Sequence, residues 1–145
     1  MTTKKVIGQP IPRLDGPEKI TGKALYGVDA KLPGMLWMKV LRSPFPHARI
    51  KNIDTSAAES MAGVSLVLTG EDLKGKLTGN VIKDQPLLCW DEVRLVGDCV
   101  AAVVAVDEDT AQEAVALIDV EYEELPAIIN PEEAHQNDAP ILHPD

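Results

Sequence analysis

The sequence predicts a small α+β domain that follows an extended N-terminal arm. Strand-like and helix-like patterns mix along the chain without the strict strand–helix–strand repeat of a doubly wound sheet. One continuously apolar, β-branched run at residues 99–106 is typical of a central strand with both faces covered. With 145 residues, 45% of them hydrophobic, the chain is long enough for one hydrophobic core.

The arm, residues 1–33, is rich in proline, glycine and charge. About 25 residues pass before any helix or strand period appears, although apolar and aromatic side chains are scattered among them. Such a segment cannot bury itself, so we expect its contacts to lie with another surface. Residues 34–136 are expected to form the folded domain, and residues 137–145 a truncated linker toward further domains.

The strands of the folded domain are expected between glycine- and proline-rich breaks. Residues 42–47 are barred from helix by Pro44 and Pro46. Residues 74–86, rich in glycine, lysine and asparagine, are expected to form a mobile loop. Apolar and acidic residues alternate over 119–123, which predicts a strand with an acidic outer face. The expected strands are residues 35–41, 49–54, 64–68, 93–96, 99–106 and 119–123.

The helices are predicted from caps and apolar spacing. Ser56 and Glu59 have the form of a capping box, which opens a short helix ending at Gly63. Acidic residues 107–109 suit a helix N-terminus, and apolar residues follow at i, i+3, i+4 and i+7. Asn130 precedes a proline and two glutamates, as at the start of a last short helix. The apolar helix face consists of Ala111, Ala114, Val115 and Ile118.

Charge is divided unevenly along the chain, whose net charge is −9. Residues 1–51 hold ten lysines and arginines against three acidic residues, whereas residues 52–145 hold four against twenty. Either the solvated faces differ in sign, or the basic arm docks on an acidic surface of this domain or a neighbour. Nucleic acid and membrane are excluded as partners by the acidic body and the short apolar runs. Without an apolar signal segment, the expected location is cytoplasmic.

Few residues offer reactive chemistry, and nucleotide-binding, nucleophile-elbow and zinc-protease motifs are missing from the sequence. Cys89 and Cys99 form no CxxC pair, so two reduced thiols are expected and a zinc site is not. The acidic residues 119–124 lack the turn of a calcium loop. One alternative stays open: a stand-alone binding or cysteine-hydrolase module in which His47, oriented by Asp98, activates Cys99. A buried, inert Cys99 is the competing interpretation.

Several blocks of the sequence, in one order and register, resemble the large subunit of the molybdenum hydroxylases. This family includes xanthine dehydrogenase, aldehyde oxidase and carbon monoxide dehydrogenase. The blocks are P-R-L-D-G-x-x-K-I-T-G-x-A-x-Y-x-x-D at residues 12–29, L-P-G-M-L at 32–36, R-S-P-x-P-H-A-R-I at 42–50, V-R-x-V-G-x-x-V-A-A-V-V at 93–104, D-V-E-Y-E-x-L-P at 119–126 and L-H-P at 142–144.

The resemblance implies an α/β hammerhead, the N-terminal domain of that subunit, with a mixed sheet and a few short helices. It implies a parent enzyme that is a molybdenum-dependent oxidoreductase. Molybdopterin would lie in the domains that follow, and 2Fe-2S clusters and FAD in partner domains or subunits. This chain would hold no cofactor, no metal and no catalytic residue, and would not be an enzyme alone. Its share would be scaffolding.

The same resemblance suggests where the scaffold meets the molybdopterin-binding domains. Arg13 and Arg42 lie in extended, proline-flanked chain, from which a guanidinium can reach a carboxylate or phosphate. The candidates for interdomain contact are Arg13, Asp15, Lys19, Tyr26, Arg42 and His47.

Overall fold

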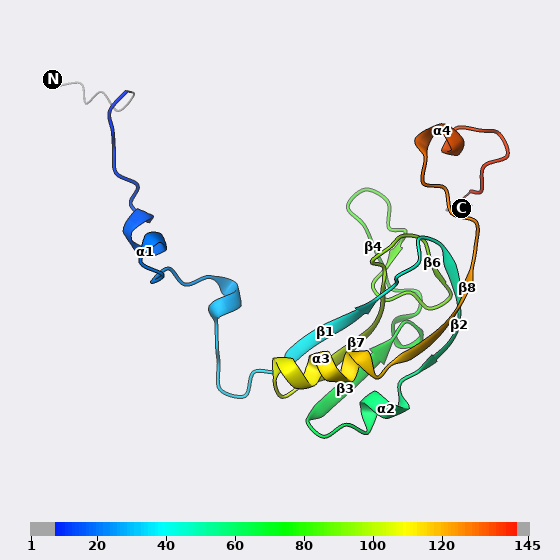
Figure 1. Cartoon of the computed structure of the whole chain (residues 1–145), viewed down its shortest axis with the longest axis horizontal. Helices are drawn as coiled ribbons and strands as arrows, with labels where there is room; N and C mark the ends of the chain where they lie inside the picture. The colour runs from blue at the N-terminus through cyan, green and yellow to red at the C-terminus, as the bar shows by residue number, and fades with distance from the viewer. Residues whose placement is uncertain (1–7, 142–145) are drawn as a thin grey trace. The chain divides into compact units, whose positions relative to one another are not determined.

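The computed structural model describes residues 8–141 of the chain. They fall into two compact units, one ending at Pro33 and the other beginning at Gly34 (Figure 1). Residues 1–7 of the expected arm lie outside the described residues, as do residues 142–145 of the expected linker with His143.

In its described part, residues 8–33, the arm contains two short helical segments that the sequence did not predict. Helix α1 spans Gly16–Ile20, and the 3-10 turn η1 spans Gly27–Asp29. A proline in the first turn of α1 and the adjacent Glu18 both favour a helix start. A helix of five residues is too short to show a 3.6-residue apolar period, so the pattern missed it. No residue of either segment is buried.

Within residues 34–141, the folded unit contains two three-stranded antiparallel sheets and a smaller ribbon. In the first sheet, β7 (Cys99–Ala105) lies between β1 (Trp37–Arg42) and β3 (Val64–Thr69). Strand β7 is the central and most buried strand of this sheet, which confirms the prediction from its apolar run. Sheets combined with short helices confirm the α+β class.

Helices cover one face of the first sheet. Helix α3 (Glu108–Ala116) contacts all three strands, and α2 (Ser56–Glu59) packs against β3 and α3 (Figure 1). The apolar face predicted for α3 is buried, and it packs against alternate side chains of β7. The core cluster comprises Ala58, Ala101, Val103, Ala114, Val115 and Ile118.

The predicted acidic start of α3 and the predicted cap of α4 are both confirmed. At the start of α3, the Asp107 carboxylate accepts a hydrogen bond from the Thr110 N–H at 2.7 Å. At the start of α4 (Pro131–Ala134), Asn130 Oδ1 accepts from the Glu132 N–H at 3.0 Å. In both helices the cap side chain satisfies a backbone donor that the helix leaves free.

The capping box predicted from Ser56 and Glu59 is wrong. The N-cap of α2 is Thr55, whose hydroxyl donates to Glu59 Oε1 at 2.6 Å. Ser56 instead donates its hydroxyl to Asp54 Oδ1 at 2.6 Å. Because Asp54 accepts from Ser56, the helix boundary lies one residue earlier than the sequence suggested. The helix ends at Glu59 rather than at the predicted Gly63. Gly63 lies in the turn before β3 with a positive φ of 91°, a conformation that glycine favours.

The second sheet places β2 (Ala48–Asp54) between β6 (Glu92–Val93) and β8 (Asp119–Glu124). Acidic residues of β8 alternate with half-buried ones and are exposed, as predicted. Strand β6 is shorter than the predicted 93–96. The chain turns there because the Asp98 carboxylate accepts hydrogen bonds from the N–H groups of Arg94 and Leu95. A second core cluster joins the sheets: Ala48, Cys89, Val93 and Val100.

Residues 74–86, expected to form a loop, contain a short antiparallel ribbon. Strand β4 (Leu77–Thr78) pairs with β5 (Gln85–Pro86), after the 3-10 turn η2 (Glu71–Leu73). Two-residue strands give too short an alternation to be distinguished from a loop by sequence pattern.

Candidate functional site

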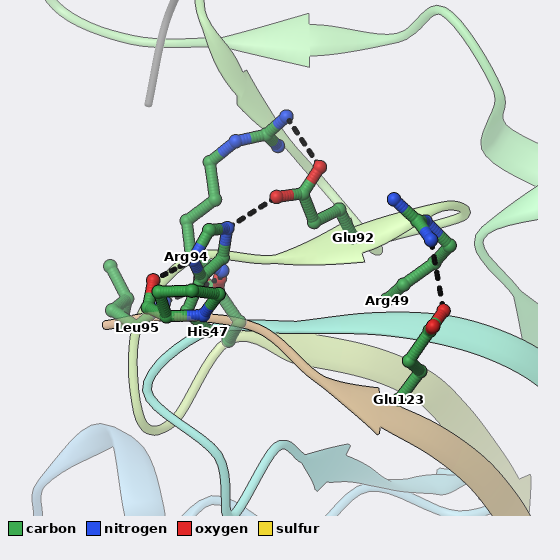
Figure 2. Close-up of polar contacts among 8 residues, drawn as sticks. His47, Arg49, Glu92, Arg94, Leu95 and Glu123 are labelled. Carbon is green, nitrogen blue, oxygen red and sulfur yellow. Dashed lines mark hydrogen bonds and ion pairs between the residues drawn. The ribbon is translucent and has the colours of Figure 1, made fainter. Parts of the chain in front are cut away.

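His47, a predicted contact residue, lies buried at the edge of the second sheet where β2 begins. It precedes β2, and 9% of its surface is exposed. Its Nδ1 lies 2.6 Å from the Pro126 carbonyl oxygen, and its Nε2 contacts the Glu92 carboxylate (Figure 2). The His47 carbonyl in turn accepts a hydrogen bond from the Leu125 N–H at 3.0 Å. His47 therefore connects the start of β2, of which it is the preceding residue, with the start of β6 and with the chain that follows β8.

Both partners of His47 are oxygen atoms, so each ring nitrogen faces a hydrogen-bond acceptor. Arg94 Nη2 lies 3.6 Å from the other oxygen of Glu92 (Figure 2). His47, Glu92 and Arg94 therefore form one continuous polar network at this edge of the second sheet.

Sequence reasoning missed Glu92 and Pro126 as partners of His47. Glu92 is 45 residues and Pro126 79 residues further along the chain, and no local pattern links them. The available signal was a polar residue beside a predicted strand, which is too common to identify a contact.

A cavity of about 350 Å³ lies beside the first sheet. Arg42, another predicted contact residue, lines it and donates from Nη1 to the Gly97 carbonyl at 2.8 Å and to Cys99 Sγ at 3.4 Å. Both cysteines are free thiols and line the same cavity. Burial, with a smaller effect of the Asp98 charge, raises the pKa of Cys89 to about 12. The other lining residues are Thr78, Asp84, Gln85, Pro86, Arg94, Leu95, Gly97 and Asp98.

The geometry gives no support to the cysteine-hydrolase alternative. Both ring nitrogens of His47 bond to Glu92 and Pro126, and no described residue that lines the cavity is a histidine. Asp98 caps the turn at Arg94 rather than orienting an imidazole. Cys99 contacts a guanidinium, which cannot act as a base.

The described residues do not fit a metal site, because within residues 8–141 no group of three or more metal-binding side chains converges. We therefore assign no metal ligand among them. Nor does any helix in this part of the chain have the length and apolar character needed to cross a membrane.

The contact candidates of the arm form a small network of charges. Asp15 accepts from Arg13 Nε at 2.6 Å and pairs with Lys19 Nζ at 2.6 Å. These two cations lower the pKa of Asp15, with Lys19 having the larger effect. The Tyr26 N–H donates to Asp29 at 2.9 Å, and the Tyr26 side chain is exposed. These contacts shape the arm locally and leave its apolar side chains in solvent: Ile11, Leu14, Ile20, Leu25, Val28 and Leu32.

Residues 21–126 match the family described as the aldehyde oxidase and xanthine dehydrogenase a/b hammerhead domain. The chain is 49% identical over 134 residues to a probable xanthine dehydrogenase subunit of Bacillus subtilis (strain 168), covering 92% of this chain and 18% of that protein. It is 42% identical over 142 residues to the nicotinate dehydrogenase large molybdopterin subunit of Eubacterium barkeri, covering 97% and 33%. The solved Cu,Mo-CO dehydrogenase in its carbon monoxide reduced state matches with a TM-score of 0.85 and 40% identity, over 93% of this chain and 18% of that one.

The chain therefore belongs to the a/b hammerhead domain family of aldehyde oxidase and xanthine dehydrogenase. This confirms the resemblance of its sequence blocks to the molybdenum hydroxylases. The chain spans between 18% and 33% of the length of the two relatives, so it corresponds to a minor part of such a protein.

Proposed function

We propose that this chain is a structural domain of a molybdopterin-dependent oxidoreductase large subunit and supplies none of the reacting groups. The main observation in support of the proposal is that nearly the whole chain aligns with a small part of such proteins. The polar contact between buried His47 and half-buried Glu92 supports the proposal, because it holds chain segments together and neither residue lines the cavity beside the first sheet.

The arm and Arg42 are the proposed contacts with the molybdopterin-binding part of the subunit. Arg13, Asp15, Lys19 and Tyr26 lie among exposed apolar side chains that a folded protein would ordinarily cover. His47 would act indirectly there, by fixing Pro126 and Glu92. Molybdopterin in the remainder of the subunit, 2Fe-2S clusters and FAD in partner domains or subunits, and a cytoplasmic location complete the proposal.

A domain exchange tests the proposal. In the Bacillus subtilis relative, the segment that aligns with this chain is replaced by this chain, and molybdenum is measured per protein by mass spectrometry. The chimera should bind as much molybdenum as the unmodified relative. The isolated chain should bind none and reduce no dye acceptor with xanthine. Turnover by the isolated chain, or a chimera without molybdenum, would contradict the proposal.

A further inference from the structure

The first sheet has two apolar faces, and within residues 34–141 helices cover one of them. Val103 packs against α3 in the core cluster. Successive side chains of a strand point to opposite faces, so Ala102 and Val104 lie on the other face. We name this the outer face. Its residues are Leu36, Met38, Val40, Leu66, Leu68, Ala102, Val104 and Val106, all apolar.

Strand register makes the outer face continuous. Met38 and Leu66 are the cross-strand neighbours of Val104, one on each side. Met38 is 61% exposed and Leu66 48% exposed. The flanking Leu36 and Val106 are about as exposed, at 49% and 53%. Four large apolar side chains therefore project into solvent from adjoining positions.

The second sheet, by comparison, has a solvent-exposed face whose side chains are charged. The exposed positions of β8 are all acidic: Asp119, Glu121, Glu123 and Glu124. Charged side chains keep such a surface hydrated, whereas a continuous apolar patch marks a contact surface. Within the folded unit, residues 34–141, nothing covers the outer face at Met38 and Leu66.

Charge argues against a second copy of this chain as the cover. Residues 34–145, which include all strands of the first sheet, hold twenty acidic residues against eight basic ones, so face-to-face pairing would bring two acidic domains together. The two relatives are several times longer than this chain, so the rest of such a subunit is the remaining candidate for the cover.

We propose that the outer face docks against an apolar surface of the molybdopterin-binding part of the same large subunit. This inference rests on the proposed function. It names the first sheet, rather than the arm alone, as a principal contact of the scaffold.

Oxidation of Met38 measures the contact without any mutation. Hydrogen peroxide converts exposed methionine to its sulfoxide, which peptide mass spectrometry locates. Met38 should oxidise at least about tenfold more slowly in the chimera with the Bacillus subtilis relative than in the free chain. Met61, which already packs against the core cluster of the free chain, is the control and should change little.

Variants provide a second measurement. Met38→Asp and Leu66→Asp should lower the urea midpoint of the free chain only slightly, because about half or more of each side chain is exposed there and aspartate is only moderately disfavoured in a strand. In the chimera they should lower molybdenum content by at least about tenfold, since a lone carboxylate would be buried at the contact. Glu121→Ala, on the acidic face of β8, is the matched control and should assemble normally.

The outcomes separate this inference from the proposed function. A wild-type chimera without molybdenum would overturn the proposed function. A molybdenum-loaded chimera in which Met38 oxidises as fast as in the free chain would overturn the docking inference alone. A free chain that sediments as a dimer, and that Met38→Asp makes monomeric, would assign the outer face to a second copy and likewise overturn it.

Discussion

Gly70 and Cys89 approach so closely that their contact leaves no room for a side chain. A Cβ atom on residue 70 would overlap the Cys89 carbonyl oxygen and lie 2.6 Å from the Cα of Trp90. The Cys89 N–H also donates to the Cys99 carbonyl at 2.7 Å. Residues 89 and 90 are thus held between the end of β3 and the start of β7, where the second core cluster begins.

Gly70→Ala should destabilise the chain by about 3 kcal/mol, because backbone atoms must move to admit one methyl group. The backbone at Gly70 is ordinary, with φ −61° and ψ −31°, so the effect would be steric alone. Gly27→Ala is the control, since a Cβ there meets open space. Urea unfolding of the two variants measures the difference, and equal midpoints would show that the close approach is absent.

His47→Ala should cost about 3 kcal/mol of folding free energy. The change removes two hydrogen bonds and leaves the Glu92 carboxylate and the Pro126 carbonyl without a partner they now have. Arg49→Ala breaks the exposed ion pair with Glu123 and should change stability little (Figure 2). Urea midpoints test both variants. A loss no larger for His47→Ala than for Arg49→Ala would refute the structural role of His47.

Asp107→Asn should reduce the acid sensitivity of the chain. Two hydrogen bonds lower the pKa of Asp107 below its ordinary value of 3.8. The larger effect comes from the Thr110 N–H and the smaller from the Thr110 hydroxyl. Stabilisation by this ionised carboxylate is present above pH 3.8 and is lost as the pH falls through the lower folded-state pKa. Asparagine keeps an acceptor but does not titrate.

Urea midpoints of wild type and Asp107→Asn, compared at neutral pH and again near pH 2, check that expectation. The wild type should be the more stable protein at neutral pH, and the difference in urea midpoint between the two proteins should be smaller near pH 2. Other capping and paired carboxylates titrate equally in both proteins, so they cancel. A gap independent of pH would contradict the role given to Asp107.

Cys89 should resist alkylation in the folded chain. Its pKa of about 12, set mainly by burial, leaves about a thousandth of the thiolate that an ordinary cysteine with a pKa of 9.0 has at neutral pH. A Cys99→Ser variant leaves Cys89 as the single thiol for iodoacetamide. Its labelling rate at about pH 8 should rise at least about 1000-fold when urea unfolds the chain. Equal rates before and after unfolding would mean that Cys89 is not buried.

Local patterns in the sequence were sufficient to predict the central elements. Strand β7 and helix α3 follow from a continuous apolar run and from four apolar residues at helical spacing. Both elements are long enough for their period to be visible, and their burial agrees with it. The caps at Asp107 and Asn130 were also predictable, because a cap bonds to a residue two or three positions away.

Features that depend on distant residues could not be predicted in this way. The partners of His47 come from β6 and from the chain after β8, and the close approach at Gly70 involves residues 89 and 90. The ribbon of β4 and β5 and the helix α1 are simply too short to show a period. The N-cap of α2 is Thr55, one residue before the predicted Ser56, whose hydroxyl donates to Asp54 instead.

The most direct test of the central claim is the turnover per bound molybdenum of the Bacillus subtilis relative after its hammerhead segment is exchanged for this chain. If the domain is scaffold and holds no reacting group, xanthine turnover per molybdenum should stay within about threefold of the unmodified relative. A fall of roughly a hundredfold at unchanged molybdenum content would contradict the account, because a residue of the exchanged domain would then contribute to the transition state.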